Sequence, residues 1–135
     1  MGKLKQRKGK PGKKLRPDFE SSPYPQFEHP VFCFRYLSKK YGLSSCDKNE
    51  KAALIEQLHL LSQMTWTDIK MADRHGCGSE KINPKSLKIP IPTHLSIDVS
   101  FYALRFMGFK AFVGYRTDFI FHILYIDTKF KLYNH

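Results

Sequence analysis

The amino-acid sequence predicts an α+β protein with an N-terminal strand, a helical hairpin and a three-stranded antiparallel meander. Three observations lead to this prediction: apolar residues at helical spacing in the middle of the chain, a period of two after residue 100, and short connections between the later strands. The chain has 135 residues, of which 41% are hydrophobic and 14% aromatic. This composition suits a single globular domain, which we expect to cover residues 19–135.

The first strand is expected directly after Pro30. Residues 31–37 (VFCFRYL) have the β-branched and aromatic content that is typical of strands. Alternation places Phe32, Phe34 and Tyr36 on one face of this strand, which we expect to be the core side.

The helical hairpin begins with a capping signal. Asp47 is followed three residues later by Glu50, and apolar residues then recur at helical spacing, which predicts a helix over about 48–63. These apolar residues are Leu54, Ile55, Leu58 and Leu61. Thr65 and Asp68 repeat the start signal for a second helix, and a glycine at 76 or 78 is expected to end it.

Three prolines lie between residues 83 and 94, and they predict an extended connection in place of a third helix. After residue 100 the apolar period is two. Residues 101–107, 110–115 and 119–126 are three strand-like runs with only two or three residues between them. Connections this short require antiparallel neighbours, which gives the meander.

The positive charge is concentrated at the N-terminus. The formal net charge is +11, and eight of the 23 Lys and Arg residues lie in the first 16 positions, which contain no acid. Subtracting these eight leaves +3 for the rest of the chain. We expect residues 1–18 to be a flexible basic arm that binds nucleic-acid phosphates. Its cations are Lys3, Lys5, Arg7, Lys8, Lys10, Lys13, Lys14 and Arg16.

Several classes of protein are disfavoured. Residues 1–30 contain no apolar stretch typical of a signal peptide and no later run would span a bilayer, so we expect a cytoplasmic protein without a membrane partner. Three widely spaced cysteines, at 33, 46 and 77, indicate reduced thiols. His75 and Cys77 have no second pair at zinc-like spacing, so neither a metal nor a small-molecule cofactor is expected.

The C-terminal third carries a family resemblance. Residues 104–113 (LRFMGFKAFV) place a Leu-Arg pair, a glycine, an aromatic and a lysine across a strand turn. An apolar strand, a turn with Asp127 and Lys129, and Tyr133 near the end follow. This pattern resembles that of the RelE/ParE toxins. The resemblance implies the fold described above and, for the RelE branch, a metal-independent endonuclease that cuts messenger RNA on the ribosome and is held inactive by a small antitoxin.

The resemblance also implies site residues. Arg105 matches the strand arginine, whose guanidinium would bind the phosphate in the transition state. Lys110 and Lys129 match two basic positions, and Tyr133 matches an aromatic that stacks on a base or takes part in proton transfer. His135 resembles a terminal histidine able to act as acid or base. Each residue also has a structural reading: a solvated sheet arginine paired with Asp98 or Asp127, surface lysines, a core tyrosine and a frayed chain end.

The segment before the meander contributes weaker candidates. Lys81 or Lys85 would stand for a lysine ahead of the catalytic strand, and the alignment leaves both open. The string Arg74-His75-Gly76-Cys77-Gly78 would bring backbone and Arg74 close to a phosphate, or simply end a helix. His122, inside an apolar strand, is expected to be a hydrogen-bonded core or edge histidine.

The sequence therefore favours a RelE-like RNA endonuclease. Two alternatives remain: a non-catalytic basic module that binds nucleic acid, and a ParE-like inhibitor that acts on a protein, since ParE relatives act against gyrase and lack the basic catalytic set.

Overall fold

The computed structural model describes residues 23–73, 78–96 and 98–133. The basic arm expected at 1–18 therefore lies outside the described residues. The elements in chain order are η2 (Pro25–Phe27), β2 (Val31–Cys33), η3 (Leu43–Ser45), α1 (Lys48–Ser62), α2 (Trp66–Met71), β3 (Ser79–Ile82), η4 (Pro84–Ser86), β4 (Phe101–Met107), β5 (Lys110–Thr117) and β6 (Ile120–Asp127).

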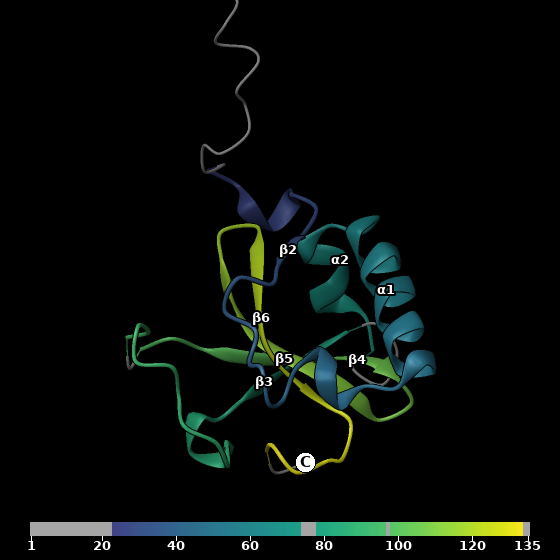
Figure 1. Ribbon diagram of the computed structural model, residues 1–135. Coiled ribbons are helices and arrows are strands. Elements are labelled where there is room, and N and C mark those ends of the chain that lie inside the picture. The colour runs from purple at the N-terminus through teal and green to yellow at the C-terminus, as the bar shows by residue number, and fades with distance from the viewer. Residues whose placement is uncertain (1–22, 74–77, 97, 134–135) are drawn as a thin grey trace, which may run out of the picture.

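The strands form one five-stranded sheet in the order β2-β6-β5-β4-β3 (Figure 1). β2 runs parallel to β6, and the other neighbouring strands are antiparallel. The α+β class is confirmed. The expected arrangement is incomplete, because the sheet is mixed and contains β3 in addition. β3 consists of only four residues, two of them charged, and a short charged strand at a sheet edge has no alternating apolar pattern to reveal it.

β2 is shorter than the sequence suggested. It ends at Cys33, and a turn follows in which the Leu37 amide donates to the Phe34 carbonyl (3.1 Å). Phe32 packs against the core, whereas Phe34 and Tyr36 are both 39% exposed. The expectation that all three aromatics face the core was therefore wrong for the last two, because alternation ends where the strand pairing ends.

The two helices begin where the capping signals lie. In α1 the Asp47 carboxylate accepts from the Glu50 amide and the Glu50 carboxylate accepts from the Asp47 amide, both at 2.8 Å. Thr65 and Asp68 make the same reciprocal pair at the start of α2. Both capping boxes are confirmed. α2 ends at Met71, several residues before the glycine that was expected to end it.

Side chains cover both faces of the sheet. α1 and α2 lie side by side on one face (Figure 1), where Leu54, Leu58 and Leu61 pack with Phe112 and Phe121 in the first core. The opposite face holds a second core, to which the segment between β3 and β4 and the C-terminal residues contribute. Its members include Ile82, Ala103, Ala111, Tyr125 and Tyr133, with Leu87, Ile89, Leu95 and Val99 packed against them.

An irregularity in β6 brings two consecutive residues into the second core. Val113 pairs with Tyr125 and Gly114 pairs with Ile123, so Leu124 is an extra residue on β6. Leu124 and Tyr125 both belong to the second core, whereas Ile126 belongs to the first. By simple alternation Leu124 and Ile126 would share one face with His122, whereas the bulge places Ile126 on the opposite face from Leu124.

Candidate functional site

The structure separates Arg105 and Lys110, two basic residues that the sequence predicts for one catalytic site. Arg105 lies two residues after Ala103 on β4 and therefore shares its face of the sheet, which is that of the second core. Lys110 faces the helices, because its Nζ lies 2.6 Å from Oε2 of Glu50 in α1. Arg105 and Lys110 therefore lie on opposite faces of the sheet and do not share one site.

Lys110 instead belongs to a partly buried ion pair. Its side chain is 27% exposed and that of Glu50 is 10% exposed. The hydrogen bond from Lys110 lowers the pKa of Glu50, with a smaller contribution from the Asp47 amide. The same hydrogen bond raises the pKa of Lys110. Both changes favour the charged forms and indicate a structural contact.

Arg105 lies in a cluster of ionisable groups on the second face. Cross-strand pairing sets Glu80 opposite Ala103, and Ala111 opposite both Arg105 and Asp127. Glu80 and Arg105 are partly exposed, whereas Asp127 is 2% exposed. The cluster thus spans β3, β4 and β6 across a row of small side chains.

Tyr133 completes this cluster. It is 2% exposed and packs in the second core with Ala103 and Ala111. Its pKa is raised to about 12, chiefly by burial and also by the carboxylates of Glu80 and Asp127, whereas the positive charge of Arg105 opposes the rise. The hydroxyl is thus protonated near neutral pH and lies within the electrostatic influence of all three charged groups.

The C-terminal turn holds Tyr133 in place. The Asp127 carboxylate accepts from the backbone amides of Lys131 (3.0 Å) and Leu132 (3.3 Å). The Lys88 amide donates to the Leu132 carbonyl at 2.7 Å, and Leu87 pairs with Tyr133 in an isolated bridge. The buried carboxylate of Asp127 therefore satisfies the backbone of the segment that carries Tyr133.

The remaining predicted residues lie elsewhere. Lys129 and Lys85 are exposed, and Lys81 is exposed on β3 opposite Tyr102. Lys81 faces away from the second core, because successive strand residues point to opposite faces and Glu80 faces that core. Arg74, His135 and the eight arm cations lie outside the described residues.

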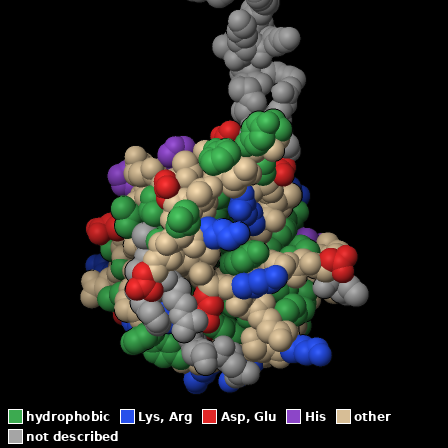
Figure 2. Space-filling model, turned by 180° about the vertical axis from the view of Figure 1, so that it is seen from behind, with side chains coloured by type: hydrophobic (Ala, Val, Ile, Leu, Met, Phe, Trp, Pro, Cys, Tyr) green, Lys and Arg blue, Asp and Glu red, His purple; other side chains and the backbone are tan. Residues whose placement is uncertain are grey.

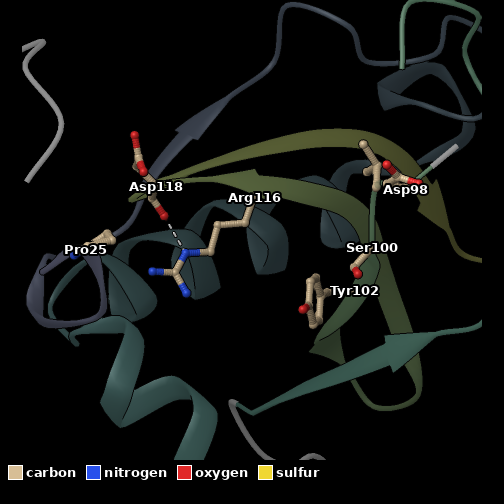
Figure 3. Close-up of a pocket in the computed structure, with 7 residues that line it drawn as sticks. Pro25, Asp98, Ser100, Tyr102, Arg116 and Asp118 are labelled. Atoms are coloured by element: carbon tan, nitrogen blue, oxygen red, sulfur yellow. Dashed lines mark hydrogen bonds between the residues drawn. The ribbon is translucent and has the colours of Figure 1, made fainter. Parts of the chain in front are cut away.

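A second polar region lies on the helix side of the sheet, around Arg116 at the end of β5. Two adjoining hollows of about 460 and 130 Å³ share Tyr102 and Arg116 in their walls. Figure 3 shows Arg116 in the larger hollow between Pro25 and Tyr102, with Asp98 and Ser100 beyond. Sequence reasoning missed this region, because the residues that line the two hollows come from five separate segments of the chain.

Basic and apolar side chains also mix on one broad face of the molecule. Figure 2, seen from behind Figure 1, shows Lys and Arg side chains near the middle of that face with hydrophobic side chains between them, and Asp and Glu side chains around them. Such mixing is typical of surfaces that bind a nucleic-acid strand through both its phosphates and its bases.

His122 is half-buried and stacks on Tyr115, with ring centroids 4.5 Å apart. Its Nε2 lies 3.0 Å from the Thr117 hydroxyl, whereas its buried Nδ1 has no partner among the described residues. Burial lowers its pKa, and the neighbouring charge of His94 lowers it further. The expected hydrogen bond is present, and the neutral ring is favoured.

The described ranges contain no group of three or more His, Cys, Asp or Glu side chains that could hold a metal ion. No helix in the same ranges is long and apolar enough to cross a bilayer. Cys33 and Cys46 are both free thiols.

No protein-family model matches the chain, and neither curated proteins nor solved structures show a significant similarity to it.

Proposed function

We propose that the protein is a RelE-type endoribonuclease that cuts single-stranded RNA at the second face of the sheet. The observation that carries this proposal is the cluster of Glu80, Arg105 and Tyr133, in which a carboxylate and a guanidinium are partly exposed beside a buried hydroxyl. The order of a strand, two helices and antiparallel strands also agrees with the order that the RelE/ParE resemblance implies.

The proposed reaction uses the RNA's own 2′-hydroxyl as nucleophile. The Glu80 carboxylate takes the proton of this hydroxyl, and the 2′-oxygen bonds to the adjacent phosphorus. Arg105 binds the phosphate oxygens, whose negative charge increases as the phosphorane forms. The bond from phosphorus to the 5′-oxygen breaks and that oxygen takes a proton from an acid, which leaves a 2′,3′-cyclic phosphate and a 5′-hydroxyl. His135 is the acid that the resemblance suggests.

Tyr133 has a different role from the one expected from sequence. A side chain that is 2% exposed is too buried to stack on a base. Its hydroxyl, protonated because its pKa is about 12, is suited to orienting the neighbouring charged groups. We therefore place Tyr133 as a positioning residue for Arg105 and Glu80.

The cellular setting belongs to the same proposal. Cleavage of messenger RNA on the ribosome, inhibition by a small antitoxin and a cytoplasmic location all follow from the resemblance. A non-catalytic nucleic-acid-binding protein is the second candidate. The guanidinium of Arg105 lies 4.6 Å from the Phe109 ring centre. This cation–π contact favours the second candidate, because it gives Arg105 a structural role that needs no catalysis.

A cleavage assay separates these candidates. The full-length protein is incubated with end-labelled single-stranded RNA and with the same RNA carrying 2′-O-methyl groups. We expect cyclic-phosphate products from the first RNA only, in the presence of a metal chelator as well, because the step requires no metal. Arg105→Gln should lower the cleavage rate by about a hundredfold or more.

Arg35→Gln is the matched control, because Arg35 also lies over an aromatic ring, that of Tyr36 at 5.4 Å, but outside the cluster. RNA binding without cleavage by the wild-type protein would support the non-catalytic candidate. In cells, DNA damage without RNA cleavage would indicate a ParE-like inhibitor.

A further inference from the structure

The hollow around Arg116 lies on the face of the sheet opposite to the proposed cleavage site. Arg116 is the last residue but one of β5. It lies on the helix side, where Trp66, Leu104 and Phe121 line the smaller hollow with it. Leu104 and Phe121 belong to the first core, whereas Glu80 and Arg105 face the second. Any ligand of Arg116 therefore meets residues that the cleavage reaction does not use.

The guanidinium of Arg116 is held in one orientation. Its Nε donates to the carbonyl oxygen of Asp118, and its plane lies over the Trp66 ring with Cζ 4.5 Å from the ring centre. The Trp66 indole is fixed in turn, because its Nε1 donates to the Phe119 carbonyl at 2.9 Å. An arginine with its side chain already ordered loses little conformational entropy when it binds an anion.

The terminal nitrogens of Arg116 are available to a ligand. Among the described residues, no hydrogen bond or ion pair engages them. Burial lowers the pKa of Arg116, while the neighbouring Tyr102 and Asp118 oppose that change. A partly desolvated guanidinium gains more from an anion than a solvated one, because water screens the interaction less.

The other walls of the hollow determine which anion fits. Tyr102 offers a half-exposed ring, and Asp98 and Ser100 offer oxygen atoms. Two carboxylates, Asp98 and Asp118, would repel a small ligand that carries only negative charge. A ligand with one phosphate, a flat ring and hydroxyl or amino donors satisfies all these groups together.

We propose that this hollow is a binding site for a nucleoside monophosphate unit, with the phosphate on Arg116, the base against Tyr102 and ribose or base donors on Asp98. Its volume of about 460 Å³ lies within the range of about 300–1,000 Å³ that is usual for small-ligand sites. The unit is a free nucleotide or one nucleotide of a single-stranded RNA. Lys70, in the wall of the smaller hollow, and Lys81, opposite Tyr102 on β3, are then placed to meet a following phosphate.

The chain carries a built-in reporter for this site, because Trp66 is its only tryptophan and lies against Arg116. The full-length protein is titrated with each of the four nucleoside 5′-monophosphates and with a four-nucleotide single-stranded RNA. Trp66 fluorescence and calorimetric heat are both followed. We expect a saturable change for at least one nucleotide. Tighter binding of the RNA would identify the strand as the source of the unit, and equal or weaker binding would identify the free nucleotide.

Two variants of equal charge test the contact. Arg116→Gln should weaken nucleotide binding about tenfold or more, as expected for the loss of a charge-assisted hydrogen bond. Arg35→Gln removes the same charge elsewhere and should leave binding unchanged. Melting curves check that both variants fold, and Tyr102→Leu provides a second variant should Arg116→Gln unfold.

Three results would overturn the proposal. The first is the absence of any fluorescence or heat change with millimolar nucleotide. The second is equal binding by folded Arg116→Gln and Arg35→Gln proteins. The third is equally tight binding of inorganic phosphate or of a phosphotyrosine peptide. RNA cleavage is measured separately, and Arg116→Gln should still cut a dinucleotide, so failure of this proposal is distinguishable from failure of the endonuclease proposal.

Discussion

The ammonium nitrogen of Lys110 lies 2.6 Å from Oε2 of Glu50 and joins the start of β5 to the first turn of α1. The pKa of Glu50 is lowered from 4.5, and that of Lys110 is raised from 10.5. The Glu50 contribution to stability is thus complete above about pH 4.5 and is lost as the pH falls through the lowered value. The Lys110 contribution is complete below 10.5 and is lost as the pH rises through the raised value.

Lys110→Met should therefore lower the melting temperature by a few degrees at pH 7. The effect should shrink as the pH falls through the lowered pKa of Glu50, because protonation of Glu50 removes the ion pair from the wild type too. Lys129→Met is the matched control, because Lys129 is exposed. Thermal denaturation of the three proteins between pH 3 and 8 checks this prediction. An equal effect of Lys110→Met at both ends of that range would contradict it.

Two glycines of the meander should respond very differently to substitution by alanine. At Gly114 a Cβ would overlap the backbone carbonyl oxygen of His122 on β6. At Gly108 a Cβ meets nothing within 4 Å, but φ is +60°. Gly108→Ala should cost about 1–2 kcal/mol of backbone strain. Gly114→Ala should cost more than about 4 kcal/mol or prevent folding, because neighbouring strands would have to separate.

Chemical denaturation of both glycine variants measures the difference. Similar losses of unfolding free energy at the two positions would show that β5 and β6 are less closely paired at Gly114 than described. The comparison also tests the bulge, because Gly114 lies where the β5–β6 register shifts.

Tyr133 should control the alkaline limit of stability. Its pKa is raised from 10.0 to about 12 in the folded protein. A raised pKa gives a stability contribution that is complete below about pH 10 and is lost as the pH rises toward 12. The free energy of unfolding of the wild type should fall by roughly 2–3 kcal/mol over this interval because of Tyr133 alone. Tyr133→Phe should remove this loss.

Denaturation midpoints from pH 9 to 12 test the alkaline prediction, with Tyr24→Phe as control because Tyr24 is 62% exposed. Absorbance of phenolate provides a second readout, since Tyr133→Phe should remove the last tyrosine to ionise before unfolding. Parallel stability curves for Tyr133→Phe and Tyr24→Phe would refute the assigned burial.

The elements that the sequence predicted well are those whose signals are local. The Asp47–Glu50 capping box and the leucine spacing place α1 at Lys48–Ser62, within a residue of expectation at its C-terminal end. The strand β4 begins and ends as expected, because alternation and the glycine at 108 lie in one segment. Local patterns did not reveal β3, since a four-residue edge strand gains its regularity from pairing with β4.

The candidate site was less accessible to sequence reasoning. Arg105 and Tyr133 were singled out from motif position, and the structure brings them into one cluster. Glu80 was missed because only the β3–β4 register shows that it faces the second core. Alternation along the sequence could not show that Arg105 and Lys110 lie on opposite faces of the sheet. The reason is a bulge between Arg105 and Met107, which shifts the pairing of β4 with β5.

Glu80 and Arg105 should act as one unit if the second face cuts RNA. Without Arg105 the phosphorane is not stabilised, and without Glu80 the 2′-hydroxyl has no base. Either loss alone should leave a similarly slow reaction. We expect Glu80→Gln and Arg105→Gln each to lower the single-turnover cleavage rate by about a hundredfold or more. The double variant should be little slower than the slower single variant.

Glu56→Gln is the charge-matched control for Glu80→Gln, because Glu56 is exposed on α1. RNA affinity is measured in parallel, so that a lower cleavage rate of Glu80→Gln can be distinguished from a loss of RNA binding. Arg105→Gln should weaken binding as well as cleavage, since the guanidinium contacts the phosphate before the reaction begins. Rate losses of the two single variants that multiply in the double variant would assign them to independent steps, and the shared-site mechanism would then be wrong.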